Sequence, residues 1–255
     1  MHGYRPMRTP ARMAAAALVL AAFTAAQPLD AQTAIPETDW NAALAPIEAD
    51  EAVMVFVDYT SGLYPIVDTI EVDEMLNNAV AAGKIAQTFD LPILVLGDEG
   101  GFYGEMHPPI KAFVGEGEQV HTRTTPSAWD SGTFREALEA TGRTQVIIGG
   151  ISTDNCTFLT SLDLLREGYD VYVMTDISGT DSRQSEEAAL LRLGAAGASF
   201  VSWIMLGSEL LEDWRTPEGE ALGAIYDTHI NGPNPSAYGS TANDGTIGTP
   251  EEQEG

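Results

Sequence analysis

The chain has 255 residues, of which 44% are hydrophobic and 20% are charged, a balance typical of a globular domain with a substantial core. Acidic residues dominate: 38 Asp and Glu stand against 12 Lys and Arg, and the formal net charge is -26. Such a field repels phosphate backbones and anionic lipid, so we expect no nucleic-acid partner and no binding to a membrane surface.

The first segment has the composition of a signal peptide. Residues 1–12 carry three arginines and no acid, and residues 13–23 form an apolar run that is too short to span a bilayer. Small residues follow, so cleavage fits after Ala26 or as late as Ala31; the alternative is an uncleaved membrane anchor. We expect a Sec-type signal at residues 1–26 and an exported mature chain, periplasmic or secreted, with no membrane contact after cleavage.

Apolar strands and helices alternate through the middle of the chain. Apolar runs predict strands that are buried on both faces, and these lie at residues 53–58, 91–97, 145–150, 169–176 and 199–203. The segment QVHT predicts a further short strand, third in chain order, at residues 119–122. Helical spacing with cap and stop residues predicts helices at residues 71–89, 131–142, 155–167, 182–196 and 205–214. This alternation predicts an α/β fold in which helices cover both faces of a parallel sheet.

The composition changes after this region. Residues 216–255 are rich in Gly, Pro, Asn, Ser and Thr and end in EEQEG. That composition predicts an irregular or disordered acidic tail. We therefore place one domain at residues 32–215 and a tail at residues 216–255.

Three chemically useful side chains follow three different predicted strands. Asp58 closes the first strand, Arg123 follows the third, and Cys156 lies just past the fourth, in GGISTDNC. Ligand sites in parallel sheets form at the carboxyl ends of the strands, so we expect the three side chains to converge.

Cys156 is the single cysteine, so it cannot form an intramolecular disulfide. Ser152, Thr153 and Asp154 are good N-cap residues, which predicts Cys156 in the first turn of a helix. Unpaired N–H groups there favour a thiolate and can bind an oxyanion. Either the thiol is buried and inert, or it is a nucleophile with Asp58 as its base and Arg123 as a nearby positive charge.

The GGISTDNC turn and the LTSLDLLREGYDVYVMTDISGT that follows closely resemble the isochorismatase-like cysteine hydrolases. The RTTPSAWD segment and the SW–EL–DW pattern at residues 202–214 are similar to the YcaC-like branch. The resemblance runs from about Val53 to Trp214. It implies a Rossmann-like three-layer α/β/α sandwich, to which the six predicted strands give a six-stranded, mainly parallel sheet, and it implies a homo-oligomer.

The resemblance also implies an Asp, Lys, Cys triad, of which Asp58 and Cys156 match the first and last members. It further implies a non-proline cis peptide at Ile151–Ser152, with the backbone N–H groups of Ser152 and Cys156 as the oxyanion hole. Arg123 stands where the family has lysine. A guanidinium has a pKa above about 12 and cannot readily shuttle protons. If the family lysine only tunes the thiolate, Arg123 can replace it. If the lysine must transfer a proton, either Asp58 carries both proton steps or the chain is inactive. A different substrate is a further explanation of the replacement.

The histidines predict neither a metal site nor a cofactor. His2, His107, His121 and His229 are scattered without ligand spacing, which disfavours a metal-dependent nicotinamidase of the same family. His107, in GEMHPPI, is a candidate substrate contact or a solvated loop residue. Trp129, in SAWD, is a candidate pocket wall or core residue.

The sequence predicts a cysteine-dependent hydrolase that cleaves the C–N bond of a small-molecule amide through a thioester. One alternative is an isochorismate-type vinyl-ether hydrolase, but family members of that kind commonly lack the cysteine. A second alternative is a catalytically silent exported binding module, which the missing lysine makes plausible.

Overall fold

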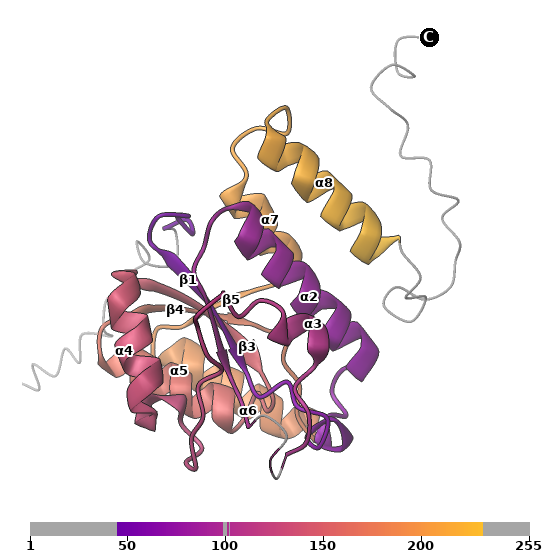
Figure 1. Ribbon diagram of the computed structural model, residues 1–255. Helices are drawn as coiled ribbons and strands as arrows, with labels where there is room; N and C mark the ends of the chain where they lie inside the picture. Colours follow the sequence, from indigo (N-terminus) through magenta and orange to yellow (C-terminus); the bar gives the residue numbers. More distant parts are fainter. Residues whose placement is uncertain (1–44, 99–100, 102, 232–255) are drawn as a thin grey trace, which may run out of the picture. The chain divides into compact units, whose positions relative to one another are not determined.

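A parallel β-sheet forms the centre of the computed structural model, which describes residues 45–98, 101 and 103–231. The strands are β1 (Ala52–Val57), β2 (Ile93–Leu96), β3 (Gln145–Gly150), β4 (Asp170–Met174) and β5 (Ser199–Val201). They lie in the order β2-β1-β3-β4-β5, and all four pairings are parallel (Figure 1). The direction in which the chain adds strands reverses between β1 and β3, and ligand sites of such sheets form at this point.

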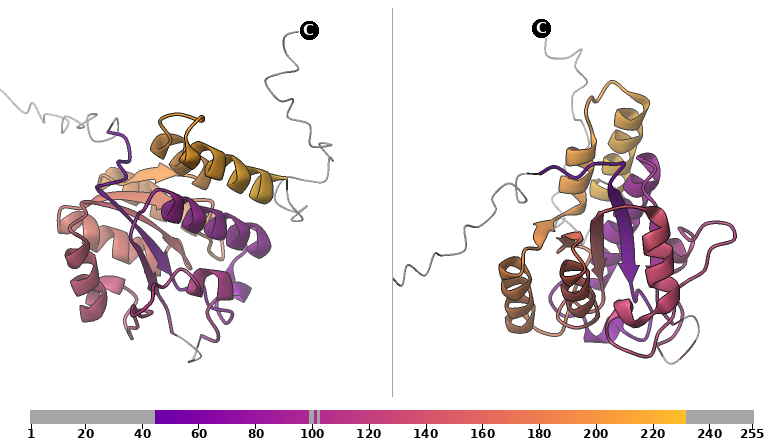
Figure 2. Two further views of the ribbon diagram at one scale, coloured as in Figure 1. Left: turned by 45° about the horizontal axis from the view of Figure 1, so that its top comes forward. Right: turned by 90° about the vertical axis from the view of Figure 1, so that its left-hand side faces the viewer.

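Helices cover both faces of the sheet (Figure 2). In chain order the helical segments are η1 (Tyr64–Ile66), α2 (Val72–Thr88), α3 (Pro108–Lys111), η2 (Ala128–Asp130), α4 (Gly132–Thr141), α5 (Cys156–Arg166), α6 (Arg183–Ala195), α7 (Trp203–Leu210) and α8 (Pro217–Ile230). One hydrophobic cluster joins α2, α3, α7 and α8 to the sheet, and a second joins α4, α5 and α6 to the opposite face. The predicted three-layer α/β/α sandwich is confirmed.

Strand β1 shows why the sheet needs both helical layers. All six of its residues are buried. Val53, Val55 and Val57 belong to one cluster, whereas Met54 and Phe56 belong to the other. Since successive side chains of a strand point to opposite faces, a strand without polar alternation must be covered on both sides.

Three of the helix boundaries follow from the expected capping chemistry. The Ser131 side chain accepts a hydrogen bond from the Phe134 N–H at the start of α4, and Gly142 ends that helix with a φ of 66°. The Ser182 side chain caps α6 by accepting from the Ser185 N–H. Serine is a favoured N-cap, and glycine tolerates the left-handed conformation that ends many helices.

The predicted third strand at residues 119–122 is wrong, and the described sheet has five strands instead of six. Only His121 pairs with the edge of β2: its N–H donates to the Val95 carbonyl at 2.9 Å, and its carbonyl accepts from the Gly97 N–H at 3.0 Å. The next carbonyl, that of Thr122, accepts from the Ser131 hydroxyl instead. The chain therefore leaves the sheet edge after a single bridge.

The predicted irregular tail is also wrong for Pro217–Ile230, which form α8. The Thr216 side chain caps the helix, Pro217 opens it, and Glu218 and Glu220 lie in its first turn. These are helix-start signals, although the Gly- and Asn-rich composition of the whole segment predicted an irregular tail. The remainder of the predicted tail, from residue 232, and the predicted signal segment lie outside the described residues. No helix within the described ranges is long and apolar enough to cross a bilayer.

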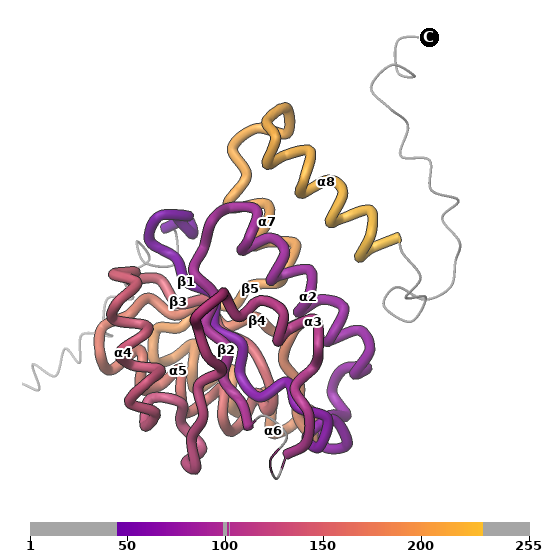
Figure 3. The backbone as a smooth tube through the Cα atoms, in the orientation of Figure 1, coloured from indigo at the N-terminus to yellow at the C-terminus, as the bar shows by residue number. Residues whose placement is uncertain are grey.

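A neutral histidine joins α8 to α2, against which α8 packs (Figure 3). His229 Nε2 lies 2.9 Å from Lys84 Nζ, and its Nδ1 lies 2.9 Å from Asn77 Oδ1. The ammonium can only donate, so Nε2 accepts and Nδ1 carries the proton. Burial, and after it the charge of Lys84, lowers the pKa of His229 below its ordinary 6.5.

This contact predicts a pH-dependent loss of stability. The unfolded chain binds a proton at His229 near pH 6.5, whereas the folded chain resists it. The contribution of His229 is therefore present above that pH and is lost as the pH falls below it. The free energy of unfolding, measured with urea at pH 7 and pH 5, should fall less in His229→Gln, whose neutral amide can bond both neighbours, than in wild type. An equal fall in both proteins would contradict this role.

Candidate active site

The predicted site lies where β1 and β3 end side by side. An added Cβ at Gly150 would stand 2.0 Å from the Val57 carbonyl oxygen, so only glycine lets the two backbones approach this closely. The Ile151 N–H donates to the same carbonyl at 3.0 Å. The chain after β1 and the turn after β3 consequently begin next to each other, at the point where the strand order reverses.

Cys156 is the first residue of α5, as predicted, and its side chain is half-buried. Ser152, Thr153 and Asp154 do not cap the helix; Asn155 occupies the N-cap position, without a side-chain capping bond. The cis peptide at Ile151–Ser152 is present. No described residue accepts a hydrogen bond from the backbone N–H of Ser152 or Cys156. The turn thus offers two free donors beside the thiol.

Asp58 directly follows β1 and is buried, with a φ of 58°. A left-handed conformation is uncommon for residues other than glycine, although aspartate tolerates it, and it is found at functional sites. Arg123 holds the Asp58 carboxylate with two hydrogen bonds, Nη1 to Oδ1 at 2.9 Å and Nη2 to Oδ2 at 2.6 Å. The two side chains are only 7% and 11% exposed.

The Pro126 carbonyl oxygen orients the guanidinium of Arg123 from the other side, accepting from Nε at 3.3 Å and from Nη2 at 3.1 Å. Burial alone would lower the pKa of Arg123, but the hydrogen bonds and charge of Asp58, with a smaller contribution from Cys156, raise it overall. Arg123 therefore stays charged throughout the physiological pH range.

The thiol of Cys156 interacts with both members of this ion pair. Burial, followed by the charge of Asp58, raises the pKa of Cys156 to about 12, and the charge of Arg123 offsets this only in part. The expectation that the helix N-terminus favours a thiolate is thus wrong, because burial and the Asp58 carboxylate raise the pKa of the thiol. The resting residue is a neutral thiol next to a carboxylate that can accept its proton.

The structure does not bring the two candidate pocket residues to this thiol. His107 precedes α3 and lines a pocket of about 470 Å³ with α2 and α8, away from Asp58, Arg123 and Cys156. Trp129 packs on Tyr169, with ring centroids 6.2 Å apart, and Arg135 lies over its ring at 5.8 Å. Trp129 is therefore a packing residue of the α4–α5 layer.

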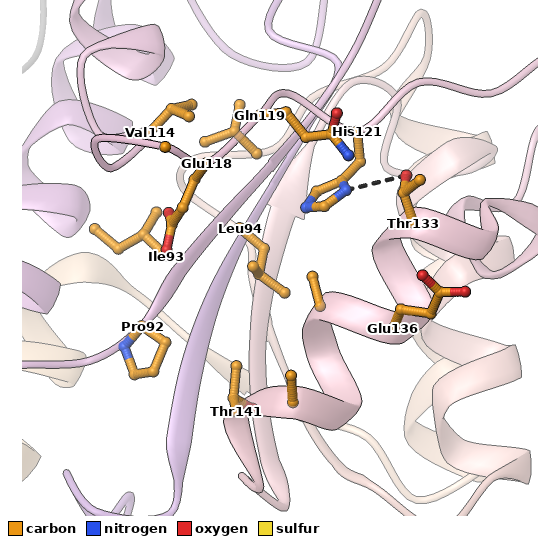
Figure 4. A pocket seen from close by; sticks show the side chains of 14 residues that line it. Pro92, Ile93, Leu94, Val114, Glu118, Gln119, His121, Thr133, Glu136 and Thr141 are labelled. Carbon is orange, nitrogen blue, oxygen red and sulfur yellow. Dashed lines mark hydrogen bonds between the residues drawn. The ribbon is translucent and has the colours of Figure 1, made fainter.

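Two hollows are lined in part by the chain between β2 and α4. The first, of about 580 Å³, runs along β2 and is bordered by His121, whose Nδ1 lies 3.2 Å from Thr133 Oγ1 (Figure 4). The second, of about 740 Å³, reaches Arg123 and is lined mainly by threonines and acids, among them Thr124 and Asp130. Arg123 thus separates Asp58 from an open polar hollow. No group of His, Cys, Asp or Glu side chains in the described ranges is arranged to hold a metal ion.

Asp154 has a role in the structure that its sequence context, which indicated only helix capping, did not reveal. Its carboxylate accepts hydrogen bonds from the hydroxyls of Ser152, Thr180 and Ser185. The position of Asp154 two residues before Cys156 was the available signal. Its distant partners were not visible, because nothing in the sequence places Thr180 and Ser185 beside this turn.

Comparisons with known proteins agree with this architecture. The family model described as the isochorismatase domain matches residues 52–205. The probable hydrolase YcaC of Escherichia coli is 36% identical over 185 residues, which are 72% of this chain and 88% of the relative. The structure of YcaC from Pseudomonas aeruginosa has a TM-score of 0.69 at 36% identity and covers 73% of this chain and 92% of its own. That of E. coli YcaC has the same TM-score at 33% identity, covering 73% and 92%. The chain belongs to the isochorismatase-like hydrolase family, in its YcaC-like branch.

Proposed function

We propose that this hydrolase cleaves the C–N bond of a small amide, with Cys156 as the nucleophile and a thioester as the intermediate. One observation carries the proposal: a half-buried thiol at the first turn of a helix shares its site with a carboxylate and a guanidinium that are hydrogen-bonded to each other. A nucleophile, a proton acceptor and a fixed positive charge are the groups that acyl transfer through sulfur needs.

Asp58 carries the proton in both directions. As the sulfur of Cys156 bonds to the carbonyl carbon, the thiol proton passes to the carboxylate, and the carbonyl oxygen becomes an oxyanion. The free N–H groups of Ser152 and Cys156 hold that oxygen. When the C–N bond breaks, the nitrogen leaves with the proton from Asp58. Water then attacks the thioester and gives a proton to Asp58, which returns it to the sulfur.

Arg123 supplies charge and orientation instead of a proton. Its raised pKa keeps it ionised, and its two bonds to Asp58 hold the carboxylate beside the thiol. It therefore replaces only the electrostatic part of the role that a lysine would have. The guanidinium also opposes the rise in the pKa of Cys156, so it stabilises the thiolate as it forms.

Two relatives support further parts of the proposal. The P. aeruginosa YcaC was crystallised with covalent acrylamide, which is both an amide and an electrophile. We expect the single thiol of this chain to react with acrylamide. The E. coli YcaC is described as an octameric hydrolase of unknown specificity, which favours a homo-oligomer here. Export, with removal of residues 1–26, is proposed from the signal-like segment.

Replacement of the nucleophile tests the proposal directly. A panel of small amides, assayed by ammonia release, should identify a substrate of wild type, and Cys156→Ala should lower its turnover at least about 10³-fold. The thermal unfolding midpoint serves as the control, since the helix N-terminus accommodates alanine. Undiminished hydrolysis by Cys156→Ala would exclude the thiol, and no hydrolysis by wild type would favour a non-catalytic module.

In Asp58→Asn, the alkylation rate of the thiol and the turnover should change in opposite directions. The loss of the negative charge should lower the pKa of Cys156 from about 12 and speed its alkylation by iodoacetamide at pH 8. Turnover should nevertheless fall, because asparagine cannot accept the proton. The alkylation rate of wild type should keep rising with pH without a plateau at neutral pH. Alkylation that slows together with turnover would contradict the role of Asp58.

Arg123→Lys should lower turnover about tenfold, because an ammonium cannot bond both oxygens of Asp58 in the geometry of the guanidinium. The charge remains, so the alkylation rate of Cys156 should change little. Both rates are measured on the same preparation. A gain in turnover would instead show that proton donation at this position limits the reaction.

A further inference from the structure

The turn between β3 and α5 is held by a carboxylate that the proposed chemistry does not use. Asp154 Oδ1 accepts hydrogen bonds from Ser152 Oγ at 2.7 Å and from Thr180 Oγ1 at 2.6 Å. Its Oδ2 accepts from the hydroxyl of Ser185. Ser152 belongs to the turn itself, Thr180 to the β4–α6 connection and Ser185 to the first turn of α6. One side chain therefore joins three segments.

The charge of Asp154 is balanced by these hydroxyls. Burial alone would raise the pKa of Asp154, but the donors, Ser185 first, lower it overall. No described basic side chain lies within ion-pair distance of it. An ionised carboxylate can only accept, so all three hydroxyls must donate to it, and their directions are fixed.

The neighbouring residue strengthens the same attachment. The Thr153 N–H donates to the Gly179 carbonyl at 3.1 Å, and its hydroxyl donates to Glu186 Oε1 at 3.4 Å. The Thr69 hydroxyl also donates to Glu186, at 2.9 Å. Consecutive residues of the turn are thus tied to the β4–α6 connection and to α6.

Ser152 has two of its three polar groups committed by these contacts. Its hydroxyl is held by Asp154, and its carbonyl accepts from the N–H groups of Asn155 at 3.3 Å and Thr157 at 3.2 Å. The N–H of Ser152 has no acceptor among the described residues. The contacts that hold the rest of the residue therefore decide where this N–H points.

We propose that Asp154 is a positioning residue that keeps the Ser152 and Cys156 N–H groups aimed at the carbonyl oxygen of the substrate. This rests on the proposed amide hydrolysis. Asp154 acts through the turn and does not change the acidity of the thiol, because the pKa of Cys156 is governed by burial, Asp58 and Arg123. The loss of the Asp154 carboxylate should therefore weaken the stabilisation of the transition state without changing the reactivity of Cys156.

The test compares Asp154→Ala with Asp154→Asn in the full chain. In the alanine variant kcat should fall about 10²-fold, the cost of misplacing reacting groups by about 1 Å, while KM changes by less than about threefold. In Asp154→Asn the amide would still accept from Ser152 and Thr180 and could donate to the Ser185 oxygen, so this variant should retain most of the activity. The rate of Cys156 modification by methyl methanethiosulfonate, which has no carbonyl oxygen, should stay at the wild-type value in both.

Glu51→Ala is the matched control. Glu51 also accepts a hydroxyl hydrogen bond, from Thr144 Oγ1 at 3.0 Å, but it lies just before β1, at the end of the sheet opposite to the site. Its loss should affect stability and leave kcat and KM unchanged. If Asp154→Ala fails to fold, Ser185→Ala removes one of the three donors and should lower kcat by a smaller factor, again with unchanged thiosulfonate reactivity.

Binding of acetaldehyde provides a readout that does not depend on turnover. The thiol sulfur bonds to the aldehyde carbon and the thiol proton moves to the oxygen, which then lies at the two N–H groups. The affinity should fall about tenfold in Asp154→Ala, as expected for a weakened hydrogen bond. Wild-type kcat or wild-type acetaldehyde affinity in that variant would overturn the inference, as would a parallel loss of thiosulfonate reactivity. Failure of wild type to hydrolyse any amide would overturn the proposed function alone, and the acetaldehyde comparison would still decide the role of Asp154.

Discussion

Two hydrogen bonds join the Arg123 guanidinium to both oxygens of the Asp58 carboxylate. Both side chains are almost entirely buried, so removing either would leave an uncompensated charge, at a typical cost of about 3–5 kcal/mol. The pair also sets the geometry of the site, because it anchors the long connection between β2 and α4 to the end of β1. The carboxylate that faces Cys156 is oriented by this contact before any substrate arrives.

The same ion pair explains the acid–base state of the thiol. Burial and the negative charge of Asp58 favour the protonated form, and Arg123 offsets only part of their effect. A neutral thiol is less vulnerable to oxidation than a thiolate, which would suit the proposed export of a chain with a lone cysteine. The thiol of Cys156 then loses its proton to Asp58 only as it attacks the carbonyl, and fixed N–H donors stabilise the oxyanion that forms. This differs from a cysteine that is already ionised by its helix.

The repeating pattern of the chain was sufficient to predict the layers of the fold. Fully apolar runs such as the one in β1 require cover on both faces, and serines such as Ser131 and Ser182 marked helix starts correctly. Residues 119–122 were predicted wrongly because the tetrapeptide QVHT does not reveal that only His121 pairs. Helix α8 was not predicted because the Gly- and Asn-rich composition of residues 216–255 favours an irregular tail, although Thr-Pro-Glu at residues 216–218 is a helix-start signal.

The sequence was sufficient to predict those parts of the site that follow from the parallel direction of the strands. Asp58, Arg123 and Cys156 all follow strand-like runs, and strand ends converge in a parallel sheet. The raised pKa of the thiol was not predictable, since it depends on burial and on the distance to a charge. Nor was the attachment of Asp154 to Thr180 and Ser185, which joins residues up to 31 positions apart. His107 shows the converse error, because a loop residue near a strand end can still face a different pocket.

The most direct test of the central claim is to observe the covalent intermediate. Wild type would be mixed with a small activated ester, whose good leaving group makes acylation faster than hydrolysis, quenched in acid and analysed by peptide mass spectrometry. The account predicts the acyl group on Cys156 during turnover and its absence in Cys156→Ala. Burst release of the alcohol with no acyl group on Cys156, or with the acyl group on another residue, would contradict it.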